Sequence, residues 1–167
     1  MERKNTWQHF RNLGLVRSIE NLLLPFDRRH CPVFHSTKAS GVFGERVAEA
    51  HLMRHNYKIL VRNYTSRWGE IDLVCRLRTF NPRDDVLVFV EVKARSKEML
   101  DTPSASVNTS KQRRLVYTAH SYMRQLEVEL PAARFDIVEV ILNTGKFPQC
   151  YIIPQAFSLP IPSPVRK

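Results

Sequence analysis

Val86-Leu87-Val88-Phe89-Val90-Glu91-Val92-Lys93 has the pattern of a buried β-strand that ends in two charged residues. Its run of β-branched and aromatic residues is apolar enough for the centre of a sheet. Side chains alternate between the two faces of a strand, so Glu91 and Lys93 lie on the same face. A carboxylate and an amine at such a position indicate either an exposed ion pair or a functional site.

A second charged residue interrupts the strand before it, Gly69-Glu70-Ile71-Asp72-Leu73-Val74, where Asp72 faces away from Ile71 and Leu73. The polar connection over 77–85 predicts an antiparallel hairpin with an enlarged loop. That pairing would bring Asp72 beside Glu91. Neighbouring carboxylates repel each other unless a proton or a cation neutralises them, and carboxylate oxygens are ligands that magnesium or manganese prefers.

Glu45 lies in a predicted helix over 43–55. At 100° per residue it aligns with Ala48 and Leu52 on a small, apolar stripe, so its carboxylate is expected to point toward the sheet. Lys93 completes the set, because an ammonium there can orient an attacking water or neutralise charge on a phosphoryl group. Asn56 suits the left-handed position that ends a helix.

The remaining periodicities place these residues in an α/β fold. After the helix, the pattern predicts strands over 58–64, 70–76 and 86–95, a helix over 110–126, a strand over 134–142 and a short strand over 151–153. This order indicates a mixed β-sheet flanked by helices in a single domain over 39–153.

Both ends of the chain differ from this domain. Residues 1–38 are a basic extension with the spacing of a partial amphipathic helix, which is more often a packing helix or a loose extension than a membrane or DNA anchor. Residues 154–167 contain four prolines, which we expect to exclude regular structure and to leave an extended tail.

The composition limits the classes of function. Twenty-six Lys and Arg oppose 16 Asp and Glu, for a net charge of +10, which favours a polyanionic partner such as nucleic acid. The three cysteines are widely separated, so neither a disulfide framework nor a thiolate zinc site is indicated. No stretch approaches the ~20 apolar residues of a membrane span, and no signal peptide is evident. We therefore expect a cytoplasmic protein without a membrane partner.

Several motifs in their order carry a resemblance to a known family. They are Gly41-x-x-Gly44-Glu45-x-x-Ala48, Asn63-Tyr64, Arg67-x-Gly69-Glu70-Ile71-Asp72-Leu73, Val88-Phe89-Val90-Glu91-Val92-Lys93-x-Arg95, Pro103, Val107, Lys111 and Arg134-Phe135-Asp136. Over about 41–142 the chain resembles the PD-(D/E)XK nucleases, and more closely the small bacterial YraN-type family related to archaeal Holliday junction resolvases. The resemblance implies a restriction-endonuclease-like (αβββαβ) core.

The same resemblance implies roles for individual residues. Asp72 and Glu91 would bind Mg²⁺, for which Mn²⁺ would substitute, with the carbonyl of Val92 and with Glu45 directly or through water. Lys93 would position the water that attacks phosphorus. Nucleic-acid contacts are assigned to Arg67, Arg95 and Lys111, although a plain surface role for Lys111 is about equally compatible with its position at the start of a helix.

These features predict a metal-dependent DNA endonuclease that acts on branched, damaged or single-stranded DNA in repair or recombination. The alternative is a non-catalytic nucleic-acid-binding module of the same fold. Paired cuts in branched DNA need two sites, which makes a homodimer attractive, although no sequence feature identifies an interface.

Overall fold

The computed structural model describes residues 32–96, 107–126 and 132–157. Its elements, in chain order, are α2 (Thr37–Arg54), β1 (Tyr57–Ser66), β2 (Gly69–Leu77), the 3-10 helix η1 (Pro82–Asp84), β3 (Val86–Ser96), α3 (Thr109–Arg124), β4 (Ala133–Leu142) and β5 (Gln149–Phe157). The predicted order of helices and strands is confirmed. The predicted amphipathic helix near the N-terminus lies outside the described residues.

The strands form one mixed sheet in the order β1-β2-β3-β4-β5. Neighbouring strands are antiparallel except β3 and β4, which run parallel and are joined through α3. A parallel pair requires such a crossover connection, and a helix usually supplies it. The sheet and its helices make the α/β architecture compatible with the restriction-endonuclease-like core expected from the sequence.

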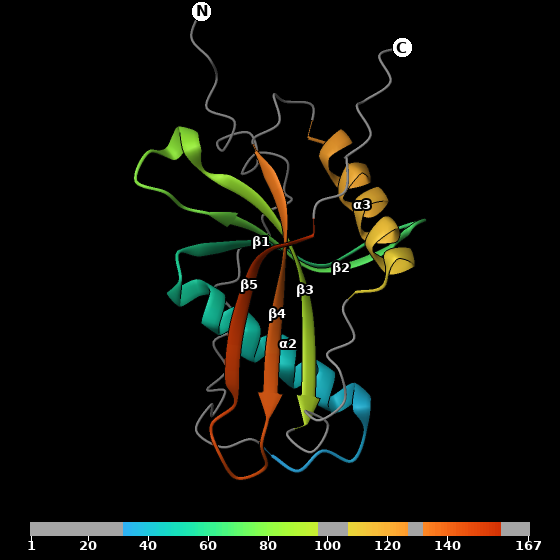
Figure 1. Ribbon diagram of the computed structural model, residues 1–167, viewed down its shortest axis with the longest axis vertical. Helices are drawn as coiled ribbons and strands as arrows, with labels where there is room; N and C mark the ends of the chain where they lie inside the picture. The colour runs from blue at the N-terminus through green and yellow to red at the C-terminus, as the bar shows by residue number, and fades with distance from the viewer. Residues whose placement is uncertain (1–31, 97–106, 127–131, 158–167) are drawn as a thin grey trace, which may run out of the picture.

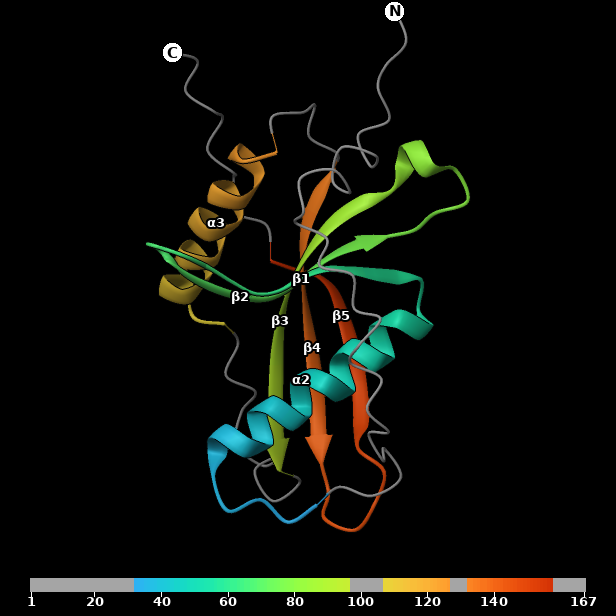
Figure 2. The same cartoon turned by 180° about the vertical axis from the view of Figure 1, so that it is seen from behind.

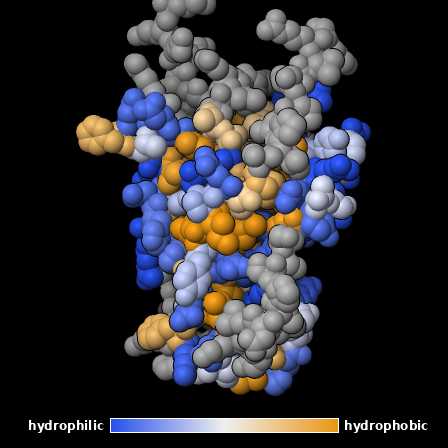
Figure 3. All heavy atoms as spheres, in the orientation of Figure 1, coloured by the Kyte–Doolittle hydropathy of each residue, from blue (hydrophilic) through white to orange (hydrophobic). Residues whose placement is uncertain are grey.

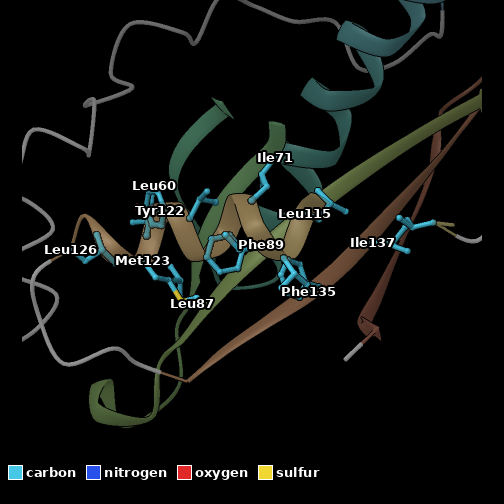
Figure 4. Packing of buried hydrophobic residues seen from close by; sticks show 14 residues of the cluster. Leu60, Ile71, Leu87, Phe89, Leu115, Tyr122, Met123, Leu126, Phe135 and Ile137 are labelled. Carbon is cyan, nitrogen blue, oxygen red and sulfur yellow. The ribbon is translucent and has the colours of Figure 1, made fainter. Parts of the chain in front are cut away.

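The two helices cover different faces and different ends of the sheet (Figures 1 and 2). Helix α2 packs through Val47, Ala48 and Leu52 on one hydrophobic cluster with β3 and β4. Helix α3 packs on a second cluster over β1 and β2, where Leu115 and Tyr122 approach the layer that contains Phe89 (Figure 4). In Figure 3, hydrophobic side chains gather near the centre of the face and hydrophilic ones along its margins.

Helix α2 begins earlier than the sequence predicted. Its N-cap is Ser36, whose side chain accepts a hydrogen bond from the Ala39 backbone N–H at 3.2 Å. Gly41 therefore lies inside the helix, and the predicted domain boundary at residue 39 falls within its first turn. A serine side chain satisfies a backbone donor that the helix itself leaves unpaired, which outweighs the low helix propensity of the glycines. Asn56 has φ 65°, the left-handed conformation predicted for the end of this helix.

The prediction that proline ends regular structure at residue 154 is wrong, because β5 continues through Pro154 to Phe157. Among the described strands, β5 pairs with β4 alone, and an edge strand tolerates a residue that lacks a backbone N–H. The pairing is irregular between Phe135 and Ile137, and there the Gln155 N–H donates to the Asp136 carboxylate at 3.0 Å. Within the part of the chain that the structure describes, no helix is both long and apolar enough to cross a membrane.

Candidate active site

Strands β2 and β3 separate at a fork in the sheet. Their paired register runs from Leu77 and Val86 to Leu73 and Val90, and Asp72 and Glu91 are the next residues on each strand. Beyond this point β2 stays paired with β1, while β3 stays paired with β4. Figure 1 shows the β1–β2 hairpin turning away toward α3 as β3 continues down the sheet. Asp72 and Glu91 therefore lie where the two strands part, just past their last paired residues.

Asp72 bridges the fork. Its carboxylate accepts a hydrogen bond from the Val92 backbone N–H at 2.7 Å, which satisfies a donor of β3 just past the last paired residues. Burial, the largest effect, and the neighbouring charge of Glu91 raise the pKa of Asp72 to about 7, while the hydrogen bond from Val92 lowers it by less than Glu91 raises it. Smaller opposing contributions to this pKa come from Glu45 and Lys111. The fork therefore holds a carboxyl group, that of Asp72, whose ionisation is disfavoured by burial and by the charge of Glu91.

Glu91 is buried, with 6% of its surface exposed, and forms an ion pair with Lys111. Lys111 lies in the first turn of α3, where the side chain of Asn108 caps the helix by accepting a hydrogen bond from the Lys111 N–H at 2.8 Å. The cap fixes the helix end at the fork, and the long lysine side chain spans from there to the carboxylate of β3. Lys111 was predicted as a phosphate contact, whereas the structure places its ammonium on a member of the acidic pair.

Glu45 approaches the acidic pair from α2. Gly44 makes this possible, because a Cβ built on it would lie 2.4 Å from the Cβ of Ala94 on β3. Burial raises the pKa of Glu45, a hydrogen bond with Asn63 lowers it, and the charge of Glu70 raises it again. The predicted inward direction of Glu45 is therefore matched by its interactions with residues of β1 and β2.

Lys93 follows Glu91 on the same face of β3, in register with Glu139 of β4. Burial lowers the pKa of Lys93, as do the charges of Arg95 and Lys111, while Glu91 and Glu139 raise it. A lysine whose pKa is lowered exchanges its proton more readily near neutral pH than a solvated lysine does. Lys93 and Arg95 are both half-buried, and the effect of Arg95 on the pKa of Lys93 places it near this group as a further positive charge.

Arg67 is not part of this cluster. It lies in the turn at the tip of the β1–β2 hairpin, where its guanidinium stands 4.7 Å from the centre of the Trp68 ring. The structure thus groups Glu45, Asp72, Glu91, Lys93 and Lys111 by their contacts and mutual electrostatic effects, and separates Arg67 from them.

Sequence reasoning assigned no role to Asn63 or Gly44 beyond their place in the resemblance. Asn63 has φ 48°, a conformation that asparagine adopts more readily than most residues, and its side chain forms a hydrogen bond with Glu45. A glycine directly before a helical glutamate was the available signal for Gly44, since it indicates a close approach of the helix to another backbone. Neither residue type reveals from the sequence which residue it contacts.

The acidic pair fits a hard divalent cation in charge and in ligand type. Among the described residues, no three or more His, Cys, Asp or Glu side chains are grouped closely enough to hold a metal. Magnesium nevertheless keeps several of its waters and is usually bound through only one or two carboxylates. Asp72 and Glu91 supply that number, and burial together with the charge of Glu91 raises the pKa of Asp72 although Lys111 lowers it.

Comparison with known proteins places the chain in a family. The profile of the Uncharacterised protein family UPF0102 matches residues 44–140, which include Glu45, Asp72, Glu91, Lys93 and Lys111. The chain belongs to the UPF0102 family. This is the YraN-type family that the sequence motifs indicated.

The match to this chain spans most of the length of several UPF0102 relatives. A UPF0102 protein of Geobacter metallireducens is 39% identical over 125 residues, which are 73% of this chain and 94% of the relative. One from Symbiobacterium thermophilum is 40% identical over 117 residues, or 70% of this chain and 94% of the relative. One from Cupriavidus pinatubonensis is 44% identical over 108 residues, or 64% and 80%.

Proposed function

We propose that this UPF0102 protein is a metal-dependent nuclease that hydrolyses the phosphodiester backbone of DNA at the fork between β2 and β3. The observation that carries the proposal is the buried pair of Asp72 and Glu91: burial, and after it the charge of Glu91, raise the pKa of Asp72 to about 7. A structural role does not require two carboxylates here, because burying like charges together is destabilising. A site that binds a cation and a phosphate accounts for both carboxylates and the lysines beside them.

In this mechanism Asp72 and Glu91 would hold Mg²⁺ or Mn²⁺, helped by the Val92 carbonyl and by Glu45, directly or through water. The bound metal would supply Lewis-acid stabilisation of the charge that develops on the phosphoryl oxygens. Lys93 orients the attacking water and, where its amine is neutral, accepts a proton from it. The water oxygen bonds to phosphorus, the bond to the 3′ oxygen breaks, and that oxygen takes a proton. The products are a 5′-phosphate and a 3′-hydroxyl.

Lys111 has a second use in this scheme. Its ammonium pairs with Glu91 in the absence of other cations, and half of its side chain is exposed. A divalent cation on Glu91 would compete with that pair and release the ammonium toward a phosphate of the substrate. This reconciles the ion pair with the phosphate contact predicted from the sequence.

The test uses purified full-length protein with junction, flap and single-stranded DNA in Mg²⁺ or Mn²⁺, beside Asp72→Asn and Lys93→Ala. Each substitution should reduce cleavage by about 100-fold or more, because each removes a group that acts on the reacting phosphate. Asp84→Asn and Lys146→Ala are the matched controls, since both residues are exposed and outside the fork, and they should cleave normally. Cleavage that persists in Asp72→Asn and Lys93→Ala would exclude this site.

One observation favours a second candidate, a nucleic-acid-binding module that does not cut. The Lys111 ammonium already neutralises Glu91, so the acidic pair is partly compensated without a metal. This candidate predicts salt-sensitive DNA binding with no product in any divalent cation, and no thermal stabilisation by Mg²⁺ that depends on Asp72.

A further inference from the structure

A hollow of about 630 Å³ lies between the tip of the β1–β2 hairpin and the outer part of α3. Aromatic and basic side chains dominate its lining, which includes Tyr64, Arg67, Trp68, Tyr117, His120 and Arg124. None of the residues that line it is acidic. Both views of the ribbon show the hairpin tip lying against α3 (Figures 1 and 2).

Two aromatic rings form a platform in this hollow. The rings of Trp68 and Tyr117 are 4.9 Å apart at an interplanar angle of 30°, and the Arg67 guanidinium lies 4.7 Å over the Trp68 ring. Trp68 remains 41% exposed and Tyr117 44% exposed. Large aromatic side chains are usually buried, so a pair held on the surface beside arginines indicates a surface that binds a ligand.

The platform is held in place by the body of the protein. Arg114 donates a hydrogen bond to the Trp68 carbonyl at 3.2 Å, and the Ser66 hydroxyl bonds to that of Thr118 at 3.3 Å. Gln125 donates to the Tyr64 hydroxyl at 2.9 Å on the far side of the hollow. These bonds hold the hairpin tip against α3, so the two elements that carry the rings are already in place when a ligand arrives, which lowers the entropic cost of binding.

Helix α3 connects this hollow to the fork. Residues 111, 114 and 118 share one face of the helix and contact, in turn, Glu91, the Trp68 carbonyl and Ser66. Tyr117 is six residues beyond Lys111, which is ~9 Å along a helix axis at ~1.5 Å per residue. Two or three nucleotides of a stacked strand span the same length at ~3.4 Å each.

We infer that the Trp68–Tyr117 platform binds unpaired nucleotides of a DNA strand, stacking a base on its rings while the arginines meet the phosphates. The inference rests on the proposed function, because DNA is taken as the ligand. The hollow would then hold the part of the DNA strand that lies next to the cleaved phosphodiester bond. Aromatic platforms beside basic side chains hold single strands in this way. Bases within a duplex are already stacked on each other, so the rings favour unpaired segments such as those in flaps and branched DNA.

Binding to the platform can be measured without cleavage, in EDTA, with fluorescently labelled oligothymidylate and a matched duplex. Tyr117→Ala should weaken single-strand binding by about 10-fold, the scale of one lost base–aromatic stack, and should change duplex binding little. Tyr117→Phe keeps the ring and should bind as the unchanged protein does. Tyr151→Ala is the matched control, because Tyr151 is a 51% exposed tyrosine on β5, away from the hollow.

Trp68 provides a direct optical signal. The chain has two tryptophans, so Trp7→Phe isolates the emission of Trp68, which oligothymidylate should quench with saturation. Absence of quenching, or equal losses of duplex and single-strand binding in Tyr117→Ala, would overturn the inference. Metal-dependent cleavage that survives in a protein without platform binding would leave the proposed nuclease intact. Platform binding without any cleavage would refute the nuclease alone.

Discussion

Burial raises the pKa of the Asp72 carboxyl group to about 7 in the folded protein, whereas an aspartate in an unfolded chain has a pKa of ~3.9. A raised carboxyl pKa means that ionisation opposes folding. Its cost is absent below about pH 4, grows as the pH rises, and is complete above about pH 7. At alkaline pH, Asp72 therefore destabilises the metal-free protein.

Asp72→Asn removes this cost and retains an oxygen that accepts from the Val92 N–H. In EDTA at pH 8, the variant should melt several degrees above the unchanged protein, and at pH 4 the two should melt together. Thermal denaturation followed by circular dichroism across this range provides the comparison. A difference in melting temperature that does not change with pH would show that ionisation of Asp72 does not destabilise the folded protein.

Replacing Lys111 should destabilise the metal-free protein. Lys111→Met keeps the length of the side chain and leaves the buried Glu91 without its ion pair, so the free energy of unfolding in EDTA should fall by about 1–3 kcal/mol. Added Mg²⁺ should recover more stability in this variant than in the unchanged protein, because a cation then meets Glu91 without competition. Lys146→Met, at an exposed lysine, is the matched control. Equal stabilisation by Mg²⁺ in all three proteins would contradict the competition.

The crossing of α2 over β3 depends on one glycine. A methyl group on Gly44 would lie 2.4 Å from the Ala94 Cβ, so Gly44→Ala should destabilise the fold by about 1–3 kcal/mol through overpacking. Gly41→Ala meets nothing within 4 Å and should stabilise the same helix by up to about 1 kcal/mol. Ala94→Gly in the Gly44→Ala background restores the space and should recover part of the loss. Denaturant unfolding would measure all four proteins, and equal stabilities for both alanine variants would disprove the close contact.

The positive charge of the whole molecule makes any association with DNA dependent on salt. For single strands the logarithm of the affinity falls with the logarithm of salt by ~0.7 per phosphate contact. Removing Arg67 and Arg124 together should reduce this slope by about 1.4, if each meets one phosphate in the hollow. Arg54→Ala is the control, since Arg54 is exposed at the end of α2. Binding titrations at several salt concentrations give the slopes, and an unchanged slope in the double variant would exclude these contacts.

The local sequence was sufficient to predict the strands, their hairpin and the residues that break their pattern. Alternation along β3 placed Glu91 and Lys93 on one face, and the hairpin placed Asp72 beside Glu91, because strand periodicity and antiparallel register are short-range properties. The boundaries of α2 and β5 were mispredicted where a serine cap and an edge position outweighed the expected effects of glycine and proline.

The partners of Lys111, Asn63 and Gly44, and the pairing of Trp68 with Tyr117, could not be obtained in this way. Each joins residues on different elements, and periodicity records which face of an element is apolar but not which neighbour that face meets. Sequence alone thus identified the acidic residues and the lysine of the candidate site. Only the tertiary structure decided that Lys111 joins this site and that Trp68 lies against Tyr117. The physical reason is that α3 crosses the β1–β2 hairpin, and this crossing brings side chains from distant parts of the sequence together.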